Sequence, residues 1–301
     1  MTLLAVNMGR HPDEATLVKA LAALPETAPV VIMLHGFRFS PDDPDRTPHR
    51  HILSLSPRRD CWKAVSWPRH LGLSGDAGLA IAYGWPARGH IWAALARADR
   101  AAEDLARLVA TLRRLAPHRP LHLVGHSLGA RVALLALRGL RRGAVDRLIL
   151  ISAALFRGEA RAVLAAAPAA DAAEIVNVTG RENLLFDALL RLAAPLGGRT
   201  VAAGVTAPNW LDVALDRPAT LAALAQLGYR IAPPTVPVCH WSGYLRPGVF
   251  GLYRALLLQP RRTPLPALRT ALAPRRKPRG RHWPAWQRSG GGQPSFLSSI
   301  R

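Results

Sequence analysis

The residues with the clearest capacity for chemistry are a serine and its two flanking glycines, in the run G-H-S-L-G at 125–129. A serine hydroxyl becomes a useful nucleophile when the chain presents it at a turn, near a base and near donors that stabilise negative charge. An apolar run at 120–124 precedes the motif, and a helical pattern at 127–140 follows it. This order of strand, G-x-S-x-G and helix is typical of a tight turn with the serine at its apex. The sequence therefore predicts that Ser127 is a nucleophile.

The elements that must position Ser127 are short apolar strands alternating with helices. Strands are predicted at 3–7, 29–34, 79–83, 120–124, 147–152 and 174–178. Helices are predicted at 13–24, 91–115, 127–140, 158–166, from the turn at 179–183 to about 192, and at 218–227 and 247–258. Continuous apolar strands separated by helices indicate an α/β protein with a mainly parallel sheet and helices on both faces.

Two long segments interrupt this alternation, at 38–70 and at 200–239. Both are expected to lie above the carboxyl edge of the sheet, where such insertions form a cap and the walls of a substrate pocket. Five tryptophans are candidate wall residues, with a place in the core as the alternative for each of them: Trp62, Trp67, Trp85, Trp210 and Trp241. The residues that bind substrate are not assigned.

The chain divides by composition into a domain at 1–259 and a basic tail at 260–301. The formal net charge is +21, with 40 Lys and Arg against 19 Asp and Glu. The tail holds ten of the cations and no acid, and it is rich in Pro, Arg, Gly and Ser, as in disordered segments. No zinc-finger spacing, basic zipper or base-stacking strand motif accompanies the charge, so no nucleic-acid partner is expected.

The expected location is the cytoplasm. The N-terminus lacks the basic region and apolar run of a signal peptide, and no apolar segment approaches ~20 residues, so no transmembrane segment is predicted. The two cysteines, Cys61 and Cys239, do not form a C-x-x-C pair and are expected to be reduced thiols.

The chain resembles the α/β-hydrolase superfamily, in its bacterial esterase and lipase-like branch, over about residues 3–258. The resemblance rests on His35-Gly36 after the second strand, on G-H-S-L-G at 125–129, and on a late histidine before the last helix. It implies an oxyanion hole made by the backbone N–H groups of Leu128 and Phe37. It also implies that His240 is the base for Ser127.

The resemblance implies a chain order of nucleophile, acid and histidine. Glu182, four residues beyond the strand at 174–178, is then the expected acid, although many relatives have Asp at this point. Asp187 is the alternative acid, one turn into the following helix. Asp212 and Asp216 are third choices.

These residues together predict a serine hydrolase that cleaves a carboxylic ester, a thioester or an amide through an acyl-enzyme. Its substrate would be a small acyl molecule, and neither a metal nor an organic cofactor is needed. Two other classes of function remain open. One is a non-catalytic binding module on the same fold. The other is a protein that binds an anionic surface or nucleic acid through the tail at 260–301.

Overall fold

The computed structural model describes residues 3–58, 60–73 and 75–273. Their core is a seven-stranded sheet in the order β1-β3-β2-β4-β5-β6-β7, with every neighbouring pair parallel. The strands are β1 (Leu3–Asn7), β2 (Val30–Leu34), β3 (Leu79–Gly84), β4 (Leu121–His126), β5 (Arg147–Ile151), β6 (Glu174–Thr179) and β7 (Trp210–Ala214). The predicted α/β class and parallel sheet are confirmed.

The central strands are largely apolar because both of their faces are covered. In β2, Val30, Ile32 and Leu34 face one core, and the alternate residues Val31 and Met33 face a second core on the other side. Parallel strands are joined by crossover helices that cover the sheet, so this pattern follows from the connectivity.

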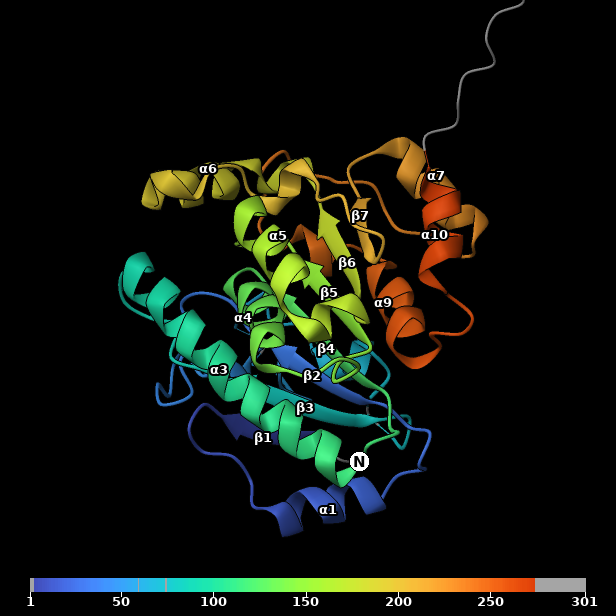
Figure 1. Ribbon diagram of the computed structural model, residues 1–301. Coiled ribbons are helices and arrows are strands. Elements are labelled where there is room, and N and C mark those ends of the chain that lie inside the picture. Colours follow the sequence, from blue (N-terminus) through green and yellow to red (C-terminus); the bar gives the residue numbers. More distant parts are fainter. Residues whose placement is uncertain (1–2, 59, 74, 274–301) are drawn as a thin grey trace, which may run out of the picture.

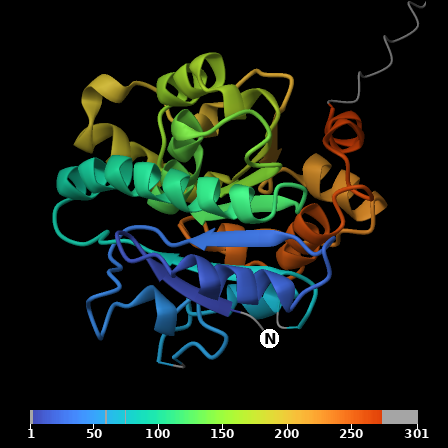
Figure 2. The ribbon, with the colours of Figure 1, turned by 60° about the horizontal axis from the view of Figure 1, so that its bottom comes forward.

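The first core lies under α1 (Glu14–Ala22), α3 (Ile91–Leu115), α4 (Leu128–Ala136) and α5 (Arg157–Ala166). The second lies under α2 (Trp67–His70), α7 (Pro218–Gln226), α9 (Val249–Leu258) and α10 (Leu265–Leu272). Figure 1 shows the two groups of helices on opposite sides of the sheet, and Figure 2 shows α3 running across it. The predicted covering of both faces is confirmed.

Two further helices lie near the carboxyl ends of the strands. α6 (Leu184–Ala193) follows β6 after a short 3₁₀ turn at Arg181–Asn183, and α8 (Ser242–Leu245) precedes α9. Figure 1 shows α6 along the top of the molecule, beyond the tip of β6. Because the carboxyl edge of a parallel sheet is where ligands bind in open α/β folds, these helices border the region expected to hold a site.

The prediction that 200–239 is an insertion above the sheet is wrong for part of that segment, because it contains the edge strand β7. In W-L-D-V-A, Trp210, Leu211 and Val213 are buried, and Asp212 and Ala214 are half-buried. A five-residue edge strand with a central acid carries a weak pattern. The segment 38–70 also adds to the core, because Ile52, Leu53 and Trp67 are buried.

Ordered structure continues beyond the predicted boundary at 259. In α10, Leu265 and Leu268 are buried in the second core. Their spacing places them on one face of a helix, a local signal that the surrounding Pro and Arg conceal. The rest of the predicted disordered tail, 274–301, lies outside the described residues.

No helix within the described ranges is both long enough and apolar enough to cross a bilayer. Both cysteines are free thiols.

Candidate active site

Ser127 lies at the turn between β4 and α4, with φ 58° and ψ −122°. A positive φ is rare for a residue with a side chain and persists only where neighbouring structure enforces it. Its N–H donates to the Ile151 carbonyl at 2.9 Å, and its carbonyl accepts from the N–H of Ala154 at 3.1 Å. The end of β5 and the loop that follows it therefore hold the N–H and the carbonyl of the serine.

Glycine is required on both sides of Ser127 because backbone segments approach closely there. A Cβ on Gly125 would lie 2.5 Å from the Gly129 carbonyl carbon, and one on Gly129 would lie 2.4 Å from the His35 carbonyl oxygen. A Cβ on Gly36 would lie 2.9 Å from the Ser127 Cβ. The loop after β2 is thus packed directly against the Ser127 turn.

His35 fixes the orientation of that loop. Its Nε2 accepts from the Trp85 N–H at 3.0 Å, so its Nδ1 carries the proton and donates to the Gly36 carbonyl at 2.9 Å. Burial lowers the pKa of His35 to about 3, and the ring is therefore neutral. The Gly36 carbonyl and the Phe37 N–H belong to one trans peptide, so His35 directs the Phe37 N–H to the opposite side.

The backbone N–H groups of Phe37 and Leu128 have no protein acceptor within the part of the chain that the structure describes. Leu128 is the first residue of α4, where an N–H has no partner inside the helix. These are the two donors expected from the sequence. Both flank Ser127, one in the loop packed on it and one adjacent to it in the chain.

His240 lies in the loop before α8, and its ring is held on two sides. Its Nδ1 is 2.6 Å from Asn183 Oδ1, and the ring of Phe186 stacks on it at 4.5 Å. The His240 carbonyl accepts from His126 Nε2 at 2.9 Å. Because an amide oxygen only accepts, Nδ1 carries the proton and Nε2 has a free lone pair.

The pKa of His240 is well below its ordinary value, chiefly because of burial and secondly because of His126 and Lys63 nearby. The ring is therefore neutral near pH 7, as a general base must be. No hydrogen bond joins the Ser127 hydroxyl to the His240 ring within the described residues. The ring of His126, the residue before Ser127 in the chain, lies 4.5 Å from that of His240.

Asn183 connects His240 to a buried carboxylate. Its side-chain Nδ2 donates to Asp187 Oδ2 at 3.2 Å, which fixes the amide with its oxygen toward His240. Asp187 is buried, and burial raises its pKa to about 6, although hydrogen bonds from Thr200 and Asn183 act in the opposite direction. The alternative acid predicted from the sequence thus reaches His240 through an amide.

The Glu182 carboxylate has different partners from the one expected for it. Its Oε1 accepts from the Ser242 hydroxyl at 2.6 Å and is paired with Arg246, which is also buried. Successive residues of the 3₁₀ turn direct their side chains differently, and Asn183 is the one that points to His240. Glu182 still supports the site through its carbonyl, which accepts from the Cys239 N–H at 2.9 Å.

The third choices lie elsewhere. Asp212, on β7, accepts from the Asn177 amide and the Trp210 indole, each at 2.8 Å. Asp216 lies beyond β7 and lines a shallow hollow with Arg181 and Val236. Sequence reasoning missed Asn183. The sequence shows Asn183 only as a short polar residue three positions after Gly180, and a search for carboxylates does not select an amide.

The five candidate tryptophans separate into two groups. Trp67, Trp85 and Trp210 are buried in the core, Trp62 is exposed, and Trp241 is partly buried beside His240. The Lys63 ammonium lies 3.5 Å from the centre of the Trp241 ring. Only Trp62 and Trp241 therefore remain candidates for contact with a substrate.

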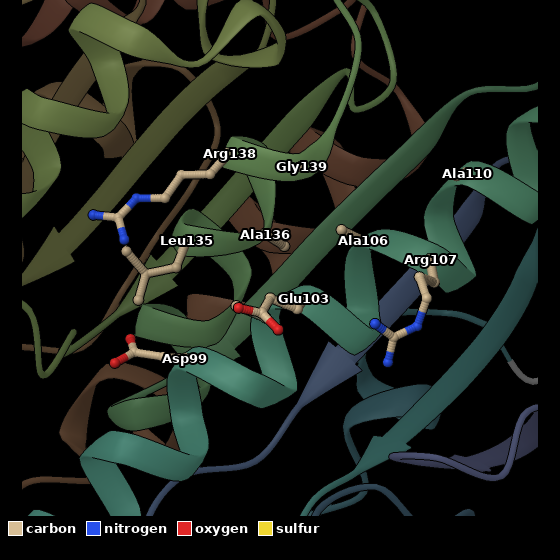
Figure 3. Close-up of a pocket in the computed structure, with 10 residues that line it drawn as sticks. Asp99, Glu103, Ala106, Arg107, Ala110, Leu135, Ala136, Arg138 and Gly139 are labelled. Carbon is tan, nitrogen blue, oxygen red and sulfur yellow. The ribbon is translucent and has the colours of Figure 1, made fainter.

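A cavity of about 470 Å³ lies away from these residues, between α3 and α4 (Figure 3). Asp99, Glu103, Arg107 and Arg138 are among its lining residues, and neither Ser127 nor His240 is. It lies on a helix-covered face of the sheet and not at the carboxyl ends of the strands. This position does not favour it as the place where Ser127 meets a substrate.

Comparison with known proteins gives distant structural matches and one family. Among curated proteins, no sequence matches this chain significantly. One similar solved structure is TT1662 from Thermus thermophilus, with 15% identity, coverage of 64% of this chain and 81% of the other, and a TM-score of 0.35. An acetylxylan esterase has 12% identity, 77% and 96% coverage, and a TM-score of 0.36. Est1E from Butyrivibrio proteoclasticus has 16% identity, 52% and 69% coverage, and a TM-score of 0.30.

A family model, described as the Alpha/beta hydrolase family, matches residues 31–297. The match includes β2 from its second residue, the His35-Gly36 turn, the Ser127 turn and the His240 loop. It also continues past 259, where the resemblance seen in the sequence ended. With this match over most of its length and a parallel sheet that carries Ser127 at a strand–helix turn, the chain belongs to the Alpha/beta hydrolase family.

Proposed function

We propose that the protein is a serine hydrolase that cleaves carboxylic esters, thioesters or amides through an acyl-enzyme on Ser127. The observation that carries the proposal is the strained conformation of Ser127, held by β5 and the loop after it and packed against the Gly36-Phe37 loop. Backbone strain of this kind concentrates at functional sites, where a side chain must be held in position for chemistry.

In the first half-reaction, Ser127 Oγ attacks the carbonyl carbon of the substrate, and its proton passes to His240 Nε2. The carbonyl oxygen becomes an oxyanion and accepts hydrogen bonds from the N–H groups of Phe37 and Leu128. When the tetrahedral intermediate collapses, the bond to the leaving group breaks and that group takes the proton from His240. The acyl group remains on Ser127 as an ester.

In the second half-reaction, a water molecule gives its proton to His240 Nε2 and attacks the acyl carbon. Collapse of this intermediate breaks the bond to Ser127 Oγ, which recovers the proton from His240. The acid is released and the enzyme returns to its starting state. Closing the hydrogen bond between Ser127 and His240 is assigned to the substrate complex, since such bonds are often long in an empty site.

Asn183 has the place of the third residue in this proposal, where the sequence favoured Glu182. Its Oδ1 holds the proton of His240 on Nδ1 and leaves Nε2 free to act as the base. A neutral amide stabilises an imidazolium less than a carboxylate does. Asp187 compensates in part, since its charge polarises the amide through Nδ2. We therefore infer a chain of His240, Asn183 and Asp187.

The test is labelling of the purified protein with a fluorophosphonate, which forms a covalent bond with an activated serine. Ser127→Ala and His240→Ala should both abolish labelling while retaining the native circular dichroism and melting temperature. Hydrolysis of p-nitrophenyl esters of increasing acyl length would then rank the substrates. If the folded wild-type protein is neither labelled nor active on any ester, thioester or amide tried, the proposal fails, and a non-catalytic binding role takes its place.

A further inference from the structure

The outer face of α6 is apolar although it faces solvent. Leu185, Leu189, Leu192 and, in the following 3₁₀ turn, Leu196 recur at the spacing of one helical stripe, and each is more than half exposed. Leu184 beside them is also more than half exposed. We call these five leucines the α6 face. A contiguous group of this kind on an otherwise folded protein marks an interaction surface.

Within the segment that carries the α6 face, the exposed charges are all positive. Within 181–200 the exposed charged side chains are Arg181, Arg191 and Arg199, while the two acids of that stretch, Glu182 and Asp187, are buried. An apolar stripe bordered by arginines matches the combination of acyl chains and negative headgroups at an anionic lipid surface. The formal charge of +21 for the whole chain acts in the same direction.

A tryptophan lies at the end of the α6 face. Trp92, at the start of α3, is exposed, and its indole N–H donates to the Ala193 carbonyl at the last residue of α6 at 2.6 Å. An indole with an apolar body and a satisfied N–H is suited to the boundary between headgroups and acyl chains. Figure 1 shows α6 at the periphery of the molecule, where a flat surface can reach it.

The opposite side of the same helix faces the candidate active site. Phe186 stacks on His240, Asp187 is buried beside Asn183, and Leu190 is buried one turn further along. We propose that the α6 face binds the surface of an anionic lipid layer, with its leucines among the acyl chains and Arg181, Arg191 and Arg199 among the headgroups. Docking in this way leaves only α6 between the lipid and the Ser127–His240 region.

The test is binding of the full chain to vesicles of phosphatidylcholine with about 30% phosphatidylglycerol, compared with vesicles of phosphatidylcholine alone, by flotation. The triple variant L185Q/L189Q/L192Q keeps every charge, including those of residues 274–301, so it isolates the apolar contribution. We expect it to bind at least about tenfold more weakly than wild type, since burying even one leucine fully is worth about that factor. R181Q/R191Q/R199Q should weaken binding to the anionic vesicles only.

V18Q/L227Q is the matched control, because these two residues are also exposed and apolar but lie on α1 and just beyond α7. It should bind as wild type does. Ser127→Ala should also bind normally, which separates a failure of this inference from a failure of the proposed reaction. The inference is overturned if wild type does not bind the anionic vesicles, or if L185Q/L189Q/L192Q binds them as tightly as wild type. It is also overturned if that variant instead dissociates a dimer, since a second copy would then cover the α6 face.

Discussion

Replacing Asp187 with Asn tests the connection between a buried carboxyl group and the base. The pKa of Asp187 is about 6 in the folded protein, against an ordinary value of 3.8, because burial disfavours the charged form. When a carboxyl group has a higher pKa in the folded chain than in the unfolded chain, the fold is most stable at low pH, where the group is protonated in both. That contribution is lost as the pH rises from about 4, where the unfolded chain begins to ionise, to about 6.

The size of the effect follows from the difference between the two pKa values. The difference between 3.8 and about 6 corresponds to about 3 kcal/mol, at roughly 1.4 kcal/mol for each pKa unit. An asparagine at position 187 has nearly the same shape and carries no charge at any pH. The free energy of unfolding of Asp187→Asn, relative to wild type, should therefore rise by about 3 kcal/mol between pH values below about 4 and above about 7.

Equilibrium unfolding in urea at several pH values measures this difference, with Asp76→Asn at an exposed loop position as the matched control. The same substitution should lower the activity, although it raises the stability at neutral pH. At neutral pH, kcat/KM of Asp187→Asn should fall by about tenfold, as when one hydrogen bond is weakened by roughly 1.4 kcal/mol. A stability difference that does not change with pH would refute the burial argument. An unchanged kcat/KM would refute the role of Asp187 in the chain to His240.

Three more predictions concern the residues around Ser127 and His240. Asn183→Leu should lower kcat by about 10²-fold or more with little change in KM, because His240 Nδ1 loses the acceptor that fixes its proton. Asn183→Asp should retain far more activity, and an equal loss in both variants would contradict this role of Asn183. His35→Phe should lower kcat by about 10²-fold through misplacement of the Phe37 N–H, while fluorophosphonate still labels Ser127 to completion over a longer time; unchanged kinetics would exclude His35 as a positioning residue. Gly36→Ala should lower the melting temperature and slow labelling, because its Cβ would lie 2.9 Å from that of Ser127, whereas Gly75→Ala, in open space, should change neither.

The sequence by itself determined the fold class and the strand–helix turn at Ser127. The apolar runs of β2 to β6 are buried on both faces, so their pattern is local and easily read. Ser127 is equally visible, because the close approach of backbone at Gly125 and Gly129 leaves a requirement for small residues in the sequence itself. The strand β7 lacked such a signal, since an edge strand with a central Asp212 resembles a loop.

Only the tertiary structure decided which side chain faces His240. Glu182 and Asn183 are neighbours in one turn, and chain order alone favours the carboxylate. Arg246, which arrives from a segment 64 residues later, takes the Glu182 carboxylate, and His240 meets the amide of Asn183. The choice depends on the direction of each side chain in a tight turn and on a buried arginine that requires a counter-charge. Neither is a property of the residues nearby in the sequence, so neither could be read before the chain was folded.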